Sequence, residues 1–153
     1  MTGQRTPPPI LAGWLALSGL APFLALAVAT PFAAGIDRSI LIQAAIAYSA
    51  VVGGFSGGVR WGAELVRAPD RPDAIRLAAA GLMTIPAWGA LLLRGQPALA
   101  IGLLALAGLV QLVWDVSAAR SGLLPAWTLR LRVGLTLIGL VCLALIGFYP
   151  QPL

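Results

Sequence analysis

Five ionisable residues near the ends of apolar segments are the ones that could do chemistry in this chain. Arg60 and Glu64 are four residues apart, which places them on one face of a helix, and Asp115 ends a later apolar segment. We expect these three to form a charge cluster with Arg130 or Arg132, which precede the last apolar run. Charges at span ends commonly anchor helices at the membrane surface, so we interpret the cluster as an anchor or inter-helix lock. A proton relay or catalysis through Glu64 and Asp115 is the alternative.

Other side chains that carry chemistry are scarce. Histidine is absent, and the single cysteine, Cys142, lies in an apolar run without a basic neighbour, which is typical of a small core residue. Zinc, thiolate-held iron–sulfur and histidine-ligated haem sites therefore lack their ligands. The sequence also contains no phosphate loop, nucleophile elbow or dinucleotide fingerprint. We expect no enzyme activity, no catalytic residues, no metal site and no cofactor.

The composition is that of an integral membrane protein. Of the 153 residues, 59% are hydrophobic and 10% are charged, and the mean hydropathy is +0.93. Soluble domains carry roughly one-quarter charged residues. The sequence therefore predicts an all-α integral membrane protein, a bundle of five transmembrane helices.

A single transmembrane domain is expected over residues 1–153, because five spans of about 20 residues leave room only for short connections. The expected spans are residues 10–29, 40–59, 77–93, 98–114 and 133–148. Residues 63–76 combine charges with two prolines and predict a polar loop. Residues 117–132 end in alternating leucine and arginine and predict an interfacial segment that lies along the membrane surface.

Two prolines and two polar side chains lie within or at the end of the expected spans. Pro22 and Pro86 each remove one backbone donor, which predicts a helix kink in the first and third spans. We interpret both as packing kinks, since neighbouring helices can satisfy the freed carbonyl groups, and a ligand-facing break is the alternative. Gln111 and Asp115 share one helix face in or beside the fourth span, so they are expected to point into the bundle.

Small residues follow two rows at four-residue spacing along the second span. The rows are Ala45, Ser49, Gly53 and Gly57, and Ala50, Gly54, Gly58 and Gly62. Helices in a bilayer gain by close packing, which such rows allow. We therefore expect a helix-packing seam inside the bundle, with a homodimer face or a groove for a flat ligand as alternatives; its residues are Ser49, Gly53, Gly54, Gly57, Gly58 and Gly62.

The ten basic residues, all arginine, are unevenly placed along the chain. With five spans, one side of the membrane holds Arg5, Arg60, Arg67, Arg71, Arg76, Arg120, Arg130 and Arg132, and the other holds Arg38 and Arg94. Short arginine-rich loops stay in the cytoplasm, which predicts a cytoplasmic N-terminus and a periplasmic C-terminus. The same arginines are expected to contact anionic lipid headgroups at the cytoplasmic face, and no nucleic acid.

Several motifs carry a family resemblance. They are the tyrosine at Tyr48, the run Phe55-Ser-Gly-Gly-Val-Arg-Trp-Gly62, the pair Pro86 and Trp88, and the segment 123–132, Leu-Leu-Pro-Ala-Trp-Thr-Leu-Arg-Leu-Arg. In these the chain resembles an uncharacterised family of small membrane proteins that includes mitochondrial transmembrane protein 69 and bacterial relatives. The resemblance covers nearly the whole chain and implies a multispan protein of a bacterial inner membrane. It implies no activity.

Two functions compete at this point. The first is a non-enzymatic accessory or assembly subunit that packs against a membrane-protein partner or forms a homo-oligomer in a bacterial inner membrane. It depends on the small-residue rows and on the absence of catalytic side chains. The second is a binder, sensor or carrier of a small hydrophobic molecule such as a quinone, lipid or tetrapyrrole, with a cavity opened by the kinks at Pro22 and Pro86.

Overall fold

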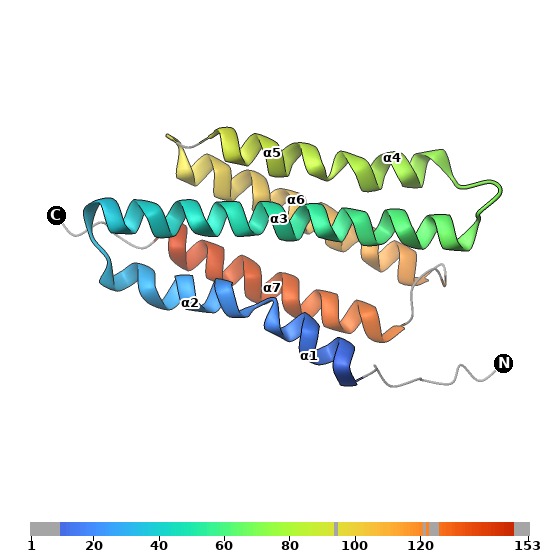
Figure 1. Ribbon diagram of the computed structural model, residues 1–153, viewed down its shortest axis with the longest axis horizontal. Coiled ribbons are helices and arrows are strands. Elements are labelled where there is room, and N and C mark those ends of the chain that lie inside the picture. Colours follow the sequence, from blue (N-terminus) through green and yellow to red (C-terminus); the bar gives the residue numbers. More distant parts are fainter. Residues whose placement is uncertain (1–9, 94, 121, 123–125, 149–153) are drawn as a thin grey trace.

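The computed structural model describes residues 10–93, 95–120, 122 and 126–148, and these are helical apart from short connections (Figure 1). The elements are α1 (Ile10–Ser18), α2 (Ala21–Ala29), the 3-10 turn η1 (Thr30–Phe32), α3 (Gly35–Arg67), α4 (Ala74–Leu82), α5 (Thr84–Leu92), α6 (Pro97–Arg120) and α7 (Ala126–Phe148). Five stretches are long and apolar enough to cross a membrane, namely Gly13–Phe32, Gly35–Arg67, Ala74–Leu92, Pro97–Arg120 and Trp127–Gly147. The all-helical fold and the number of spans are thus confirmed.

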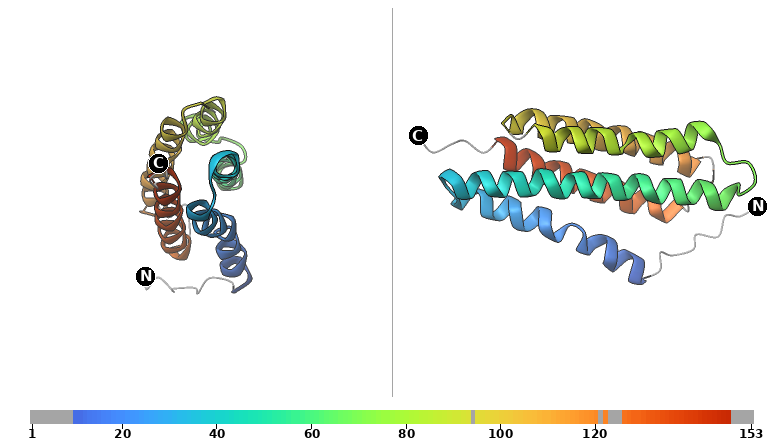
Figure 2. Two further views of the ribbon diagram at one scale, coloured as in Figure 1. Left: turned by 90° about the vertical axis from the view of Figure 1, so that its left-hand side faces the viewer. Right: turned by 45° about the horizontal axis from the view of Figure 1, so that its top comes forward.

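The longest helix, α3, runs along the whole length of the bundle and organises it (Figure 1). It packs against α2, α4, α5 and α6, while α6 also contacts α5 and α7, and α7 packs on α2. The end-on view in Figure 2 shows the resulting arrangement, with α4 and α5 on one side of α3 and α1 and α2 on the other. The shared core includes Phe23, Ile46, Ile101, Leu104 and Ile146.

The first span is broken next to Pro22. Helix α1 ends at Ser18 and α2 begins at Ala21, so Pro22 lies in the first turn of α2, where its missing N–H leaves no intrahelical bond unmade. The carbonyl oxygen of Gly19, in the break, accepts a hydrogen bond of 2.8 Å from the hydroxyl of Tyr48 on α3. The neighbouring helix thus satisfies a carbonyl group exposed by the break.

The third span is broken in the same way near Pro86. Helix α4 ends at Leu82 and α5 starts at Thr84, with Met83 between them. Because Pro86 has no N–H, the carbonyl group of Leu82 four residues earlier loses its usual intrahelical donor. The hydroxyl of Thr84 donates to the carbonyl oxygen of Gly81 at 2.8 Å and supports the broken turn.

The expected loop at residues 63–76 is wrong at both ends. Helix α3 continues to Arg67, and α4 already begins at Ala74, so the connection is much shorter than the charged stretch. Glu64 and Arg67 form an ion pair one turn apart, which favours helix over loop in the polar segment. The second span likewise begins earlier than predicted, at Gly35, whose φ of 53° lies in the region that favours glycine.

The expected surface segment at residues 117–132 is also corrected. Residues 117–120 are the last turn of α6 and residues 126–132 are the first turns of α7, while residues 121 and 123–125 lie outside the described part. The reversal includes Gly122, whose φ of 73° suits glycine. The fourth and fifth spans are therefore longer than predicted.

The two small-residue rows of α3 have different surroundings. A methyl group on Gly57 would lie 2.6 Å from the carbonyl oxygen of Ala80, so here α3 and α4 are in close backbone contact. On the second row a methyl group on Gly54, Gly58 or Gly62 would meet no described atom within 4 Å. Four residues turn about 40° past a full helical turn, so a row drifts around the helix. Ser49 and Gly57 of the first row are buried, whereas a methyl group on Gly53 of the same row would also meet no described atom within 4 Å. Within the described chain the predicted seam is therefore found at Ser49 and Gly57 and is absent at Gly53, Gly54, Gly58 and Gly62.

Candidate functional site

Arg60 and Asp115 form a buried ion pair that joins α3 to α6. Arg60 Nε donates to Asp115 Oδ1 at 2.9 Å, and Arg60 Nη2 lies 2.9 Å from Oδ2, so the guanidinium engages both carboxylate oxygens. The side chains are 7% and 3% exposed. Arg60 Nη2 also donates to the backbone carbonyl oxygen of Gln111 at 3.1 Å. A bidentate contact of this kind fixes both the distance between the two side chains and their relative orientation.

Two further residues extend this pair across three helices. The side-chain amide of Gln111 donates to the carbonyl oxygen of Gly53 on α3 at 3.2 Å. Arg132 of α7 places Nη1 3.7 Å from Asp115 Oδ2. We call Arg60, Gln111, Asp115 and Arg132 the inter-helix cluster, because it connects α3, α6 and α7.

A second group of charges closes the connection between α3 and α4. The Glu64 carboxylate, 2% exposed, is paired with Arg67, whose Nε lies 2.9 Å from Oε2, and accepts the backbone N–H of Asp73 at 2.8 Å. Arg76 Nη1 lies 3.6 Å from the same carboxylate. Asp73 Oδ1 accepts the N–H groups of Ile75 at 2.9 Å and Arg76 at 3.2 Å, which caps α4. We call Glu64, Arg67, Asp73 and Arg76 the connector cluster.

The single cluster expected from the sequence is therefore two clusters. Arg60, Asp115 and Arg132 come together, whereas Glu64 belongs to the connector cluster. Arg130 is exposed and forms no ion pair with the described residues. From the sequence, Arg67 and Arg76 were expected only to face anionic headgroups, and Asp73 had no expected role. Glu64 to Arg67 and Asp73 to Arg76 nevertheless have the three-residue spacing of helix-surface pairs.

Both clusters lie at the same end of the bundle. The end of α3, the start of α4, the end of α6 and the start of α7 meet there (Figure 1). Buried Arg38 marks the opposite end of α3, 22 positions before Arg60. At about 1.5 Å per residue this separation is about 33 Å, close to the roughly 30 Å of a bilayer hydrocarbon core. The separation of Arg38 from Arg60 along α3 thus matches the thickness of the hydrocarbon core.

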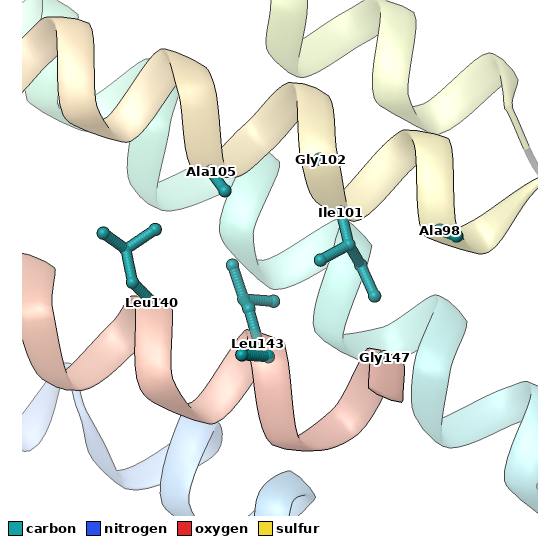
Figure 3. A pocket seen from close by; sticks show the side chains of 8 residues that line it. Ala98, Ile101, Gly102, Ala105, Leu140, Leu143 and Gly147 are labelled. Atoms are coloured by element: carbon teal, nitrogen blue, oxygen red, sulfur yellow. The ribbon is translucent and has the colours of Figure 1, made fainter. Parts of the chain in front are cut away.

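An apolar cavity of about 120 Å³ lies between α6 and α7, towards the other end of the bundle (Figure 3). Figure 3 shows Ile101 of α6 and Leu140 and Leu143 of α7 pointing into the space between the two helices. The full lining is Ala98, Ile101, Gly102, Ala105, Leu140, Leu143, Ala144 and Gly147. It contains no polar side chain. Pro22 of α2 and Pro86 of α5 are not among the residues that line it.

The comparison with known families decides what the chain is. The family model described as "Protein of unknown function (DUF3429)" matches residues 8–148. The chain belongs to the DUF3429 family. Transmembrane protein 69 of Xenopus tropicalis is 30% identical over 144 residues, which make up 92% of this chain and 54% of that protein. The chain thus spans about half the length of this relative, and the resemblance expected from the motifs is confirmed. No solved structure matches it.

In this DUF3429 protein the two buried carboxylates, those of Asp115 and Glu64, are each paired with an arginine. Both oxygens of Asp115 contact Arg60, and both oxygens of Glu64 contact Arg67. In the described part of the chain no three histidine, cysteine or acidic residues are placed to hold a metal ion. Cys142 is buried in the core, 3% exposed. This arrangement of charges is suited to holding helices together at the membrane boundary.

Proposed function

We propose that this DUF3429 protein is a non-enzymatic accessory or assembly subunit of a membrane complex, and that it binds its partner through α3. The observation that carries the proposal is the second glycine row. Gly58 and Gly62 are exposed, and methyl groups there or on Gly54 would contact no described part of the chain. In lipid, small-residue rows are the surfaces on which transmembrane helices approach closely.

The neighbouring side chains give this row the character of a helix-docking face. Val51 and Phe55 are 67% and 70% exposed and border the glycines on α3. These two large side chains lie beside the row of glycines, and such a surface suits an apolar helix that carries small residues of its own. The two charge clusters hold α3 against α4, α6 and α7, so the face is presented on a fixed helix.

Site-specific photocrosslinking in native membranes tests the proposal. A crosslinker at Val51 is expected to give one defined protein adduct. An adduct of twice the monomer mass identifies the partner as a second copy of the chain. Val113 of α6, 69% exposed, is the matched position and is expected to give none. Gly58→Leu should abolish the Val51 adduct. Equal or absent crosslinking at the two positions contradicts the proposal.

For location and orientation we propose a multi-pass protein of a bacterial inner membrane with its N-terminus in the cytoplasm. The support is the gathering of charges at one end, where Arg60, Arg67, Arg76 and Arg132 join the two clusters, with Arg38 at the other end of α3. Anionic headgroups of the cytoplasmic leaflet are then the lipid surface that these arginines meet. A reporter fused after Leu153 is expected to be active outside the cytoplasm, and activity confined to the cytoplasm contradicts this orientation.

A second candidate function is favoured by the cavity between α6 and α7. Pockets for drug-sized ligands hold about 300–1,000 Å³, so a cavity of about 120 Å³ is too small to enclose a tetrapyrrole. Its apolar lining suits part of an alkyl chain. Binding of a spin-labelled fatty acid, lost in Ala105→Leu and kept in Ala47→Leu on the exposed face of α3, supports this function; binding unchanged in both contradicts it.

A further inference from the structure

The two charge clusters differ in their balance of charge. The connector cluster sets the carboxylates of Glu64 and Asp73 against the guanidinium groups of Arg67 and Arg76. The inter-helix cluster sets one carboxylate, Asp115, against two guanidinium groups. It therefore carries one positive charge in excess. A charge at the edge of the hydrocarbon region is costly unless an opposite charge or a polar group compensates it.

The excess charge belongs to Arg132. Arg60 already engages both oxygens of Asp115 at 2.9 Å, whereas Arg132 Nη1 lies 3.7 Å from Oδ2, which is longer than a hydrogen bond. A guanidinium carries five N–H donors. Within the described chain those of Arg132 make no hydrogen bond, although its side chain is only 21% exposed. Arg132 thus places a positive charge at the surface of the bundle. Its N–H groups donate to no described residue and are free to bind another acceptor.

The position of Arg132 determines which acceptors are available to it. It lies six residues after Ala126, the first residue of α7, or about 9 Å along the helix from the polar end. Arginine side chains at this depth extend towards the headgroups. Phosphate oxygens are the anionic acceptors of that layer, and the guanidinium fork matches phosphate with two parallel hydrogen bonds.

Resting on the membrane placement proposed above, we propose that Arg132 binds the phosphate group of one anionic membrane lipid, whose charge neutralises the inter-helix cluster. The bound lipid completes the joint between α6 and α7 that Asp115 begins. Neighbouring Arg130 is two residues away, hence on the opposite side of α7, and is exposed. It is a matched control, since it has the same charge at the same depth and lies outside the cluster.

The test uses purified protein in nanodiscs of phosphatidylcholine, with and without phosphatidylglycerol, and compares the wild type with Arg132→Gln and Arg130→Gln. Phosphatidylglycerol is expected to raise the unfolding temperature of the wild type and Arg130→Gln, and to leave that of Arg132→Gln unchanged. Native mass spectrometry should show phosphatidylglycerol affinity lowered about tenfold in Arg132→Gln, the loss that about 1.4 kcal/mol represents.

Three results overturn the proposal. The first is an equal phosphatidylglycerol effect in the wild type and Arg132→Gln. The second is a wild-type unfolding temperature in phosphatidylcholine alone that equals the one with phosphatidylglycerol, which contradicts the need for an anionic lipid. The third is full stabilisation by inorganic phosphate in detergent, which makes free phosphate the ligand. If Arg132→Gln does not fold, Arg132→Lys replaces it; weaker phosphatidylglycerol binding at unchanged stability in phosphatidylcholine supports the proposal, and equal binding overturns it.

Discussion

The guanidinium of Arg60 and the carboxylate of Asp115 meet through two contacts of 2.9 Å, although the residues are 55 positions apart in the sequence. This pair fixes the second span to the fourth at the charged end of the bundle, and Arg132 brings the fifth span to the same point. The polar end of the bundle is thus held by charge, while its middle is held by apolar packing.

Asp115→Asn should destabilise the bundle strongly. The substitution keeps the shape of the side chain but leaves two guanidinium groups without a counter-charge, and breaking a buried pair from one side costs about 3–5 kcal/mol. Equilibrium unfolding of the purified protein measures the loss. Asp37→Asn, at an exposed position of α3, is the control and should change stability little. Equal effects of the two substitutions would show that the inter-helix cluster does not contribute to stability.

Gly57→Ala and Gly58→Ala should have opposite effects on the purified protein. The methyl group at Gly57 meets the carbonyl oxygen of Ala80 at 2.6 Å, so α3 and α4 must separate, at a cost of about 1–3 kcal/mol. At Gly58 the methyl group enters open space, and alanine favours the helix by up to about 1 kcal/mol. Unfolding temperatures of the two variants compare the sites directly. Destabilisation at Gly58 alone would contradict the packing described.

Tyr48→Phe should loosen the break between α1 and α2. The variant keeps the ring, which packs edge-on against Phe23 at 5.0 Å between centroids, and loses only the hydrogen bond to Gly19. Hydrogen bonds between membrane helices contribute about 0.6 kcal/mol on average, so a small global loss is expected. Hydrogen exchange should accelerate in the first turn of α2. Ser18→Ala, which removes a bond to the carbonyl oxygen of Leu15 on the same helix, should leave that turn unaffected.

Asp73→Ala should destabilise the start of α4, because it removes the side chain that caps two backbone N–H groups. Loss of an N-cap costs about 1 kcal/mol, and Asp73→Asn should retain most of it. Asp70→Ala changes an exposed carboxylate in the same connection and serves as the control. Proteolysis of the connection should be faster in Asp73→Ala alone. Equal cleavage of both alanine variants would exclude the capping role.

The parts of the fold that depend on local chemistry could be predicted from the sequence. Five apolar runs indicate five spans, and the positions of Pro22 and Pro86 indicate where two of them break, since a missing N–H acts within one turn. The end of α3 could not be placed, because charged residues are frequent both in loops and in the ion-paired last turn of a helix. Here the pair of Glu64 and Arg67 favours the helix.

The features of the fold and of the candidate site that depend on tertiary packing could be predicted from the sequence only in part. Arg60 and Glu64 share a helix face, yet Arg60 reaches α6 and Glu64, one turn nearer the end of α3, reaches the connection to α4. Spacing along one helix does not reveal where the neighbouring helix ends. For the same reason the sequence could not show that α4 covers Gly57 and leaves Gly58 exposed.

The hydrogen bond between Tyr48 and Gly19 also has a consequence for biogenesis. During synthesis the first span emerges before α3. The helix of this span is interrupted at Gly19, and the carbonyl group of Gly19 gains its hydrogen bond only when Tyr48, 29 positions downstream, has been made. An unsatisfied carbonyl group is costly in hydrocarbon. We expect the first two spans to leave the insertion machinery together as a helical hairpin, with Tyr48 as the contact that completes the pair.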